Sequence, residues 1–123
     1  MTPALNWNGT ANITVTVDDG NGDTDSEEFT LTVGAINDPP VLDVIGNQSI
    51  DEDDILEITL SATDPEDDSL TFSAESSDST NVPVSVTGDV LTATPVLNWN
   101  GVVNITVTVD DGIVTVSETF QLT

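Results

Sequence analysis

Hydrophobic and polar residues alternate along most of the chain with a period of two residues. Segments 13–17 and 29–33 show the pattern clearly, with aliphatic or aromatic side chains at odd positions and Thr at even positions. This period is typical of β-strands that bury one face. Since no segment shows the 3.6-residue apolar period of a helix, the sequence predicts an all-β protein.

Beyond residue 40 the alternation predicts seven short strands. They cover residues 41–45, 55–62, 69–75, 82–87, 89–94, 102–109 and 114–122. Segments rich in Gly, Asn, Asp and Ser separate them, as expected of turns. Seven antiparallel strands at this spacing predict a seven-stranded β-sandwich of Ig-like or cadherin-like type.

One phrase occurs twice. "TPALNWNG" at residues 2–9 returns as "TPVLNWNG" at 94–101, and Thr2–Gly20 matches Thr94–Gly112 at 16 of 19 positions. A fixed long period is typical of tandem repeats. We therefore interpret residues 1–33 as the C-terminal strand pair of a preceding repeat, 34–40 as a linker, and 41–123 as a nearly complete repeat.

The predicted strand pair of residues 1–33 would expose a hydrophobic face if it stood alone. Two interpretations are open: its missing strands lie upstream in a longer protein, or the pair completes the sheet of a neighbouring subunit by strand donation. In the linker, Pro39 and Pro40 end the preceding strand and stiffen the joint.

The repeated phrase places Trp7 and Trp99 just before a strand, between turn-forming Asn and Gly residues. A large aromatic side chain at this position is expected to anchor one end of a hydrophobic core. The functional alternative is an exposed Trp that stacks on a sugar ring, which would make the chain a glycan-binding module.

The chain carries 23 Asp and Glu residues and no Lys, Arg or His, for a formal charge of -23. Side-chain salt bridges are therefore impossible, and self-repulsion calls for an external cation. Nucleic acid and direct membrane insertion are excluded as modes of binding, because the first needs basic side chains and the second a long apolar segment. There is no Cys to form a disulfide.

Many carboxylates are clustered in turns at strand ends, where they would repel one another. Ca²⁺ suits such sites because it takes six to eight oxygen ligands in irregular geometry, whereas zinc prefers His or Cys. The alternative is a solvated acidic surface, adapted to high salt, without a specific metal site. Nucleophilic catalysis lacks a His or Lys base, so we predict that the chain is not an enzyme.

"INDPPV", "DEDDILEITLSATDPEDDSLTFS" and "VNITVTVDDG" resemble the tandem cadherin-like repeats, of dystroglycan-type cadherin or bacterial Ig-like kind, of large bacterial and archaeal surface adhesins. The resemblance covers essentially the whole chain. It implies an extracellular, calcium-binding repeat of a stalk, fibre or biofilm filament, whose partners are neighbouring repeats or identical subunits and, as a further possibility, cell-surface glycans.

The resemblance also implies a ligand set, with calcium between consecutive repeats. The ligands carried over are Asn37, Asp38, Asp64, Glu66, Asp68, Asp110 and Asp111, with Glu52 at the far end of the repeat. This sequence departs from the family where "DPDGD" becomes "DPEDD", which places Asp67 at the position of a turn-forming Gly.

Overall fold

The computed structural model describes residues 2–123, which contain strands and turns but no helix. The prediction of an all-β protein is thus confirmed. The chain divides into two compact units, of which the first ends at Asn37 and the second comprises Asp38–Thr123. No helix in the described part of the chain could span a membrane.

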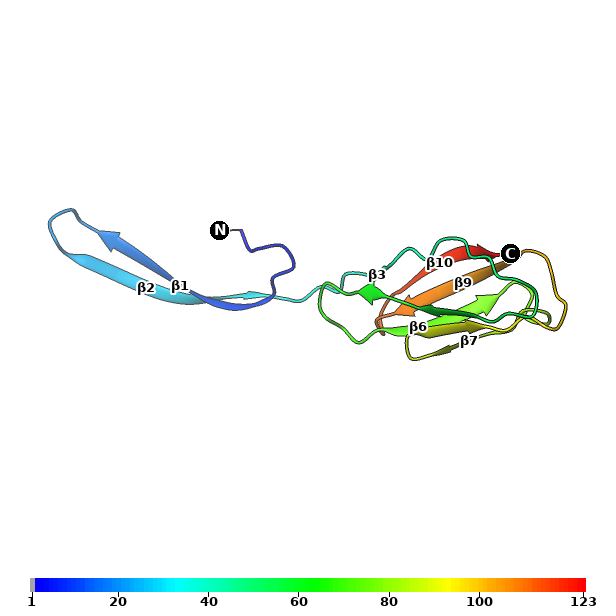
Figure 1. The fold of residues 1–123 in the computed structure, drawn as a ribbon. Coiled ribbons are helices and arrows are strands. Elements are labelled where there is room, and N and C mark those ends of the chain that lie inside the picture. Colours follow the sequence, from blue (N-terminus) through cyan, green and yellow to red (C-terminus); the bar gives the residue numbers. More distant parts are fainter. Residues whose placement is uncertain (1) are drawn as a thin grey trace. The chain divides into compact units, whose positions relative to one another are not determined.

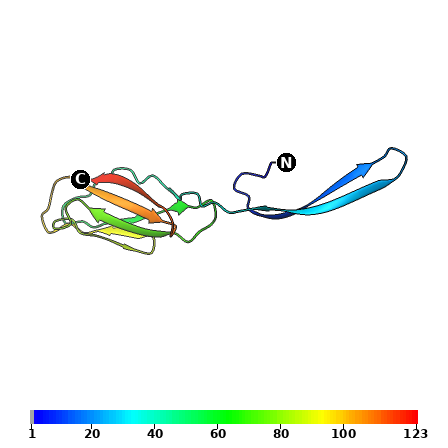
Figure 2. The same ribbon diagram turned by 180° about the vertical axis from the view of Figure 1, so that it is seen from behind.

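The first unit is an antiparallel hairpin of β1 (Gly9–Asp18) and β2 (Thr24–Val33), drawn in blue and cyan in Figures 1 and 2. Ile13 lies opposite Phe29 in its register. Directly opposed residues share a face, so the alternating sequence makes one face largely apolar, with Glu27 and Asp25 opposite Val15 and Val17 near the turn, and the other rich in Thr. Within residues 2–37 no further strand covers the apolar face, and Val15, Val17 and Phe29 are exposed.

The second unit contains eight strands, all in antiparallel pairs. They are β3 (Val41–Leu42), β4 (Leu56–Thr59), β5 (Ala62–Thr63), β6 (Thr71–Ser76), β7 (Val84–Thr87), β8 (Val90–Ala93), β9 (Val103–Asp110) and β10 (Thr115–Leu122). Two sheets have three strands each, in the orders β10-β9-β6 and β4-β8-β7, and β3 pairs with β5.

The eight strands differ from the seven predicted because the expected strand 55–62 divides into β4 and β5. The Leu60 N–H donates to Asp89 O at 2.7 Å beside β8, while Ser61 O accepts from the Asp43 N–H at 2.9 Å beside β3. The chain therefore changes its pairing partner between two consecutive residues. Each of the other six predicted strands has one counterpart, although 41–45 is reduced to two residues.

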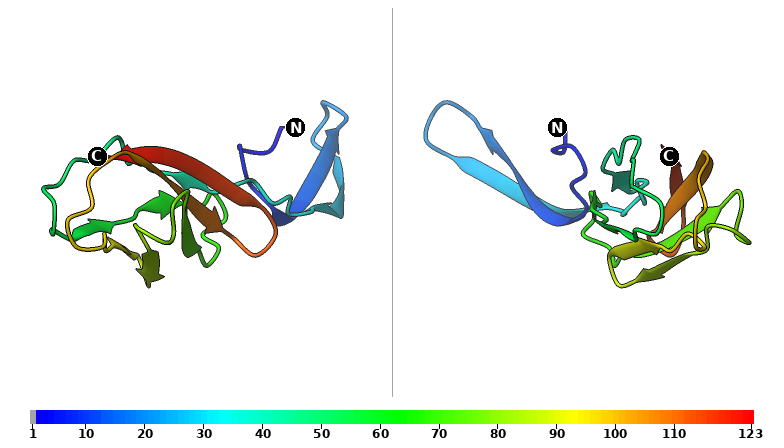
Figure 3. Two further views of the ribbon diagram at one scale, coloured as in Figure 1. Left: turned by 90° about the vertical axis from the view of Figure 1, so that its right-hand side faces the viewer. Right: turned by 45° about the vertical axis from the view of Figure 1, so that its right-hand side comes forward.

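One hydrophobic core joins the two three-stranded sheets. Its buried residues are Leu56, Leu60, Val82, Leu91, Ala93, Val103, Ile105, Val107, Phe120 and Leu122. Figure 3 shows β9 and β10, in orange and red, on one side of this unit and β7, in olive, on the other. Trp99 is partly buried and packs against the cluster, as predicted for a core anchor.

The outer face of β9 and β10 carries neutral cross-strand pairs. The hydroxyls of Thr106 and Thr119 lie 2.8 Å apart, and those of Thr108 and Ser117 lie 2.7 Å apart. Such pairs link the two strands without using charge.

Candidate metal centre

The topology brings several strand ends together at one end of the second unit. Val41, the first residue of β3, pairs with Thr63, the last of β5, and Thr71 at the start of β6 pairs with Asp110 at the end of β9. Gln48 forms a parallel bridge with Leu122, so residues 41–48 run in the same direction as β10. The acidic segments next to these strand ends therefore share one end of the unit.

Asp64 organises the loop between β5 and β6. Its Oδ1 accepts hydrogen bonds from the Glu66 N–H at 2.9 Å and the Asp68 N–H at 3.1 Å. These bonds bend the loop around one carboxylate oxygen. Asp67 completes the bend in the left-handed region, with φ of 60°.

The second oxygen of Asp64 has a different environment. Asp64 Oδ2 is buried and accepts no hydrogen bond from residues 2–123. Burying a charged oxygen without a partner is costly, and a bound cation is one way to offset the cost. Because the chain has no cationic side chain, the cation would have to come from solution.

Asp38 and Glu66 lie on different segments and meet in the structure. The Asp38 backbone N–H donates to Glu66 Oε2 at 3.1 Å across 28 residues. This bond ties the start of the second unit to the Asp64 loop. Asn37, the preceding predicted ligand, is the last residue of the first unit.

Asp110 and Asp111 follow β9 and shape the turn to β10. Asp110 Oδ1 accepts from the Gly112 N–H at 2.7 Å, and Asp111 Oδ1 accepts from the N–H groups of Ile113 at 2.7 Å and Val114 at 2.6 Å. Asp111 is the buried charged residue of the unit. Its role in fixing the turn was missed by sequence reasoning, although an Asp before Gly is an ordinary turn signal.

The predicted ligands are thus partly gathered. Asp38, Asp64, Glu66 and Asp68 are linked by the hydrogen bonds above, and Asp110 and Asp111 lie at the same end of the unit. In the conformation described for residues 2–123, no three carboxylates are placed so that they could hold a metal ion together. Binding would therefore require side chains to rotate.

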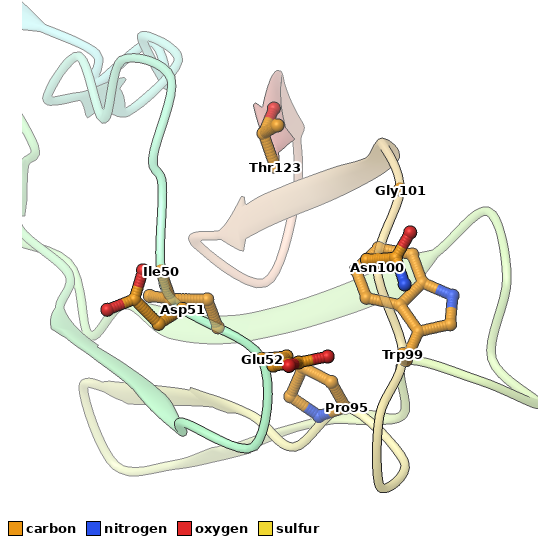
Figure 4. A pocket seen from close by; sticks show the side chains of 8 residues that line it. All are labelled: Ile50, Asp51, Glu52, Pro95, Trp99, Asn100, Gly101 and Thr123. Carbon is orange, nitrogen blue, oxygen red and sulfur yellow. The ribbon is translucent and has the colours of Figure 1, made fainter.

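Glu52 lies at the opposite end, beside Thr123 beyond the end of β10. It lines a cavity of about 130 Å³ together with Ile50, Asp51, Pro95, Trp99, Asn100, Gly101 and Thr123. Figure 4 shows Trp99 on one wall of this cavity and Asp51 and Glu52 on another.

The hairpin repeats the turn found after β9. Asp18 Oδ1 accepts from the Gly20 N–H at 2.7 Å, and Asp19 Oδ1 accepts from the N–H groups of Asn21 at 2.8 Å and Asp23 at 3.2 Å. The bond from Asn21, followed by that from Asp23, holds the pKa of the Asp19 carboxyl below its usual value. Both acidic pairs therefore have a turn-forming role.

An all-β module with one core between two three-stranded sheets fits an Ig-like domain. The sequence model of the bacterial Ig domain family matches residues 37–123, and the chain belongs to this family. The bacterial Ig-like part of the predicted resemblance is thus confirmed. No curated protein matches the chain.

Several solved structures share similarity with the chain. Two are endo-fucoidan hydrolases of glycoside hydrolase family 107, MfFcnA4 at 20% identity with a TM-score of 0.49 and MfFcnA9 at 19% with 0.47. The third comprises domains 4 and 5 of the S-layer protein SbsC, at 17% identity and a TM-score of 0.42.

The matches cover most of this chain and a smaller share of the other proteins. The match includes 99% of this chain for both hydrolases but only 20% and 23% of theirs, and 94% against 58% for SbsC. The chain therefore spans less than a quarter of the length of the hydrolases.

Proposed function

We propose that this chain is a calcium-stabilised Ig-like repeat of an extracellular structural or adhesive protein, such as a stalk, fibre or biofilm filament. Its role is mechanical rather than catalytic. Calcium binds at the acidic end of the second unit and stiffens the array of which the repeat is part.

The observation that carries the proposal is the buried Asp64 Oδ2, which has no hydrogen-bond partner among residues 2–123. Asp38, Glu66, Asp68, Asp110 and Asp111 supply further oxygen ligands at the same end. A set made only of oxygen donors suits Ca²⁺. Neutralisation of these carboxylates would also relieve part of the repulsion in a chain of charge -23.

The mechanism is thermodynamic linkage. An ion that binds the folded unit and not the unfolded chain raises the free energy of unfolding by mass action, by about 2.7 kcal/mol when calcium is at about 100 times its Kd. Because Asp38 belongs to both the linker and the acidic end, the same ion would hold the start of the module in place.

The test is thermal unfolding of the whole chain in chelator and in millimolar calcium, with magnesium and sodium at matched ionic strength as controls. We expect calcium to raise the Tm by roughly 10–20 °C, given about 4–8 °C per kcal/mol for a unit of this size. Asp64→Asn keeps an oxygen for the loop hydrogen bonds but removes the charge, and should abolish the calcium-dependent rise.

A matched control is Asp89→Ala, which removes one carboxylate from the exposed turn between β7 and β8. This variant should keep the full calcium response. If sodium stabilises the chain as much as calcium, or if both variants respond like the unaltered chain, the carboxylates form only a solvated acidic surface and the proposal is wrong.

A further inference from the structure

The β1–β2 hairpin repeats both the sequence and the register of β9–β10. Positions 24–32 match positions 115–123 at six of nine residues, including Phe29 with Phe120 and Leu31 with Leu122. Ile13 lies opposite Phe29 as Ile105 lies opposite Phe120. The two hairpins are therefore equivalent pieces of structure.

Equivalent side chains of the two hairpins differ in burial. Phe29 is 52% exposed where Phe120 is 2%, and Val15 is 57% exposed where Val107 is fully buried. Val17 and Val109 show the same contrast, at 65% and 0%. The hairpin thus has the side chains of a core-facing sheet surface, but no other strand in the described part of the first unit packs against them.

The second unit shows what covers such a face. Leu56 of β4 and Leu91 and Ala93 of β8 belong to the same core cluster as Ile105 and Phe120. In addition, β6 pairs along the edge of β9 that β10 leaves open. A complementary partner must therefore supply both an apolar sheet and an edge strand.

We propose that the β1–β2 hairpin completes an Ig-like module whose other strands have the pattern of residues 38–93 of this chain. In that module Phe29 and Leu31 occupy the places of Phe120 and Leu122, and the open edge of β1 pairs with a strand equivalent to β6. The proposal shares with the proposed function only the idea of a repeat array and does not depend on calcium.

Polar contacts add specificity to this fit. In the second unit the Ile45 N–H donates to Glu118 Oε1 at 3.3 Å, and the Asn104 N–H donates to Ser77 Oγ at 3.0 Å. Glu27 and Asn12 occupy the equivalent places in the hairpin. A partner with the pattern of residues 38–93 offers the matching amide and hydroxyl, whereas an unrelated apolar surface does not.

A second copy of this chain fits the face less well. Its strands β4, β6 and β8 already hold its own β9–β10, so insertion of β1–β2 would displace an equivalent hairpin and expose the same apolar face elsewhere. Exchange between copies therefore gains no buried apolar area.

The test joins a second copy of residues 38–93 directly before Thr2, which restores the order seen at Ala93–Thr94. Amide hydrogen exchange is then compared between the extended and the unextended chain, in chelator and in millimolar calcium. We expect exchange of the β1–β2 amides to slow by roughly 100-fold or more in the extended chain, approaching the rates of β9–β10. The second unit serves as an internal reference for folding.

Two variants of the extended chain make the test specific. Phe29→Asp puts a charge on the apolar face and should remove the added protection, while Thr30→Asp puts the same charge on the opposite face and should preserve it. The proposal is overturned if extension adds no protection, or if Phe29→Asp remains protected. It is likewise overturned if the unextended chain forms a dimer with equal protection that Phe29→Asp dissociates, since the occupant is then a second copy.

Failure of this test can be told apart from failure of the calcium proposal. Protection of β1–β2 reports the covering of the hairpin, whereas the calcium-dependent Tm reports the acidic end of the second unit. Protection without a calcium response leaves the inference standing, and a calcium response without protection leaves only the proposed function.

Discussion

The Trp99 ring lies against Gly101, so close that a Cβ atom on Gly101 would stand 3.3 Å from Cζ2 of the indole. Gly101 also has φ of 154°, which side-chain-bearing residues rarely adopt. Trp7 and Gly9 have the same arrangement in the hairpin, with a corresponding distance of 3.6 Å. The repeated phrase thus encodes a Trp packed on a Gly.

Gly101→Ala should therefore destabilise the second unit by about 1–3 kcal/mol, through backbone strain and displacement of Trp99 from the core. Urea unfolding monitored by circular dichroism measures the loss. Gly88→Ala is the control: Gly88 has φ of 64° but open space at the Cβ position, so only the left-handed cost of about 1 kcal/mol applies. Equal losses for the two variants would contradict a packing role for Trp99.

The equivalent residues Phe120 and Phe29 give a second prediction. Phe120→Ala removes a fully packed core side chain and should lower the free energy of unfolding of the second unit by about 3–5 kcal/mol. Phe29→Ala, in the hairpin, should change that free energy by less than about 0.5 kcal/mol. Denaturant unfolding followed by hydrogen exchange of the β9 amides separates the two effects.

Asp67 offers a stabilising substitution. Its φ of 60° lies in the left-handed region, where Gly is favoured because it has no Cβ. Asp67→Gly should raise the free energy of unfolding by up to about 1 kcal/mol relative to Asp67→Asn. Both variants lose the same charge, so their difference in urea unfolding isolates the backbone term. A Gly variant less stable than the Asn variant would contradict this account.

Asp78 should make stability depend on pH. The Asn81 side-chain amide donates to Asp78 Oδ2 at 2.7 Å and the Asn81 backbone N–H to Oδ1 at 3.2 Å, which lowers the pKa of Asp78 below its ordinary 3.8. A lowered folded-state pKa stabilises the fold above the unfolded pKa, and this contribution is lost as the pH falls through the folded pKa.

The measurement compares the Tm of the unaltered chain with that of Asp78→Ala across the pH range. The difference should be constant from neutral pH to about pH 5 and shrink below about pH 3.8. Taking the difference removes the general effect of protonating the other carboxylates, which relieves repulsion in both chains. A difference that stays constant into strong acid would show that the Asn81 bonds do not favour the charged form.

Most strands could be predicted from the sequence because alternation directly reflects which face is buried. The division of residues 55–62 could not, because it depends on hydrogen bonds from Leu60 to Asp89 and from Asp43 to Ser61. Those partners are distant in sequence, and alternation continues unchanged through the point where the pairing changes.

The contacts within the Asp64 loop of the candidate site could also be anticipated from the sequence. The resemblance to cadherin-like repeats supplied Asp64, Glu66 and Asp68 as candidate ligands within one acidic run, and short acidic turns commonly bond their own backbone. The bond between Asp38 and Glu66 spans 28 residues and depends on how β3 meets β5. The buried state of Asp64 Oδ2 likewise arises from packing that no spacing reveals.

The hydroxyl pairs of Thr106 with Thr119 and Ser117 with Thr108 determine how the β9–β10 pair responds to pH and ionic strength. Hydroxyls carry no net charge, so neither acid nor dissolved salt changes their pairing directly. In a chain without basic residues, carboxylates on this face would have only like-charged neighbours. On this face the β9–β10 pair presents hydroxyls, while Glu75 of β6, opposite Thr106, places a carboxylate on the same sheet. The direct response to ions is therefore expected from Glu75 and the acidic loops at the strand ends and not from the β9–β10 hydroxyl pairs.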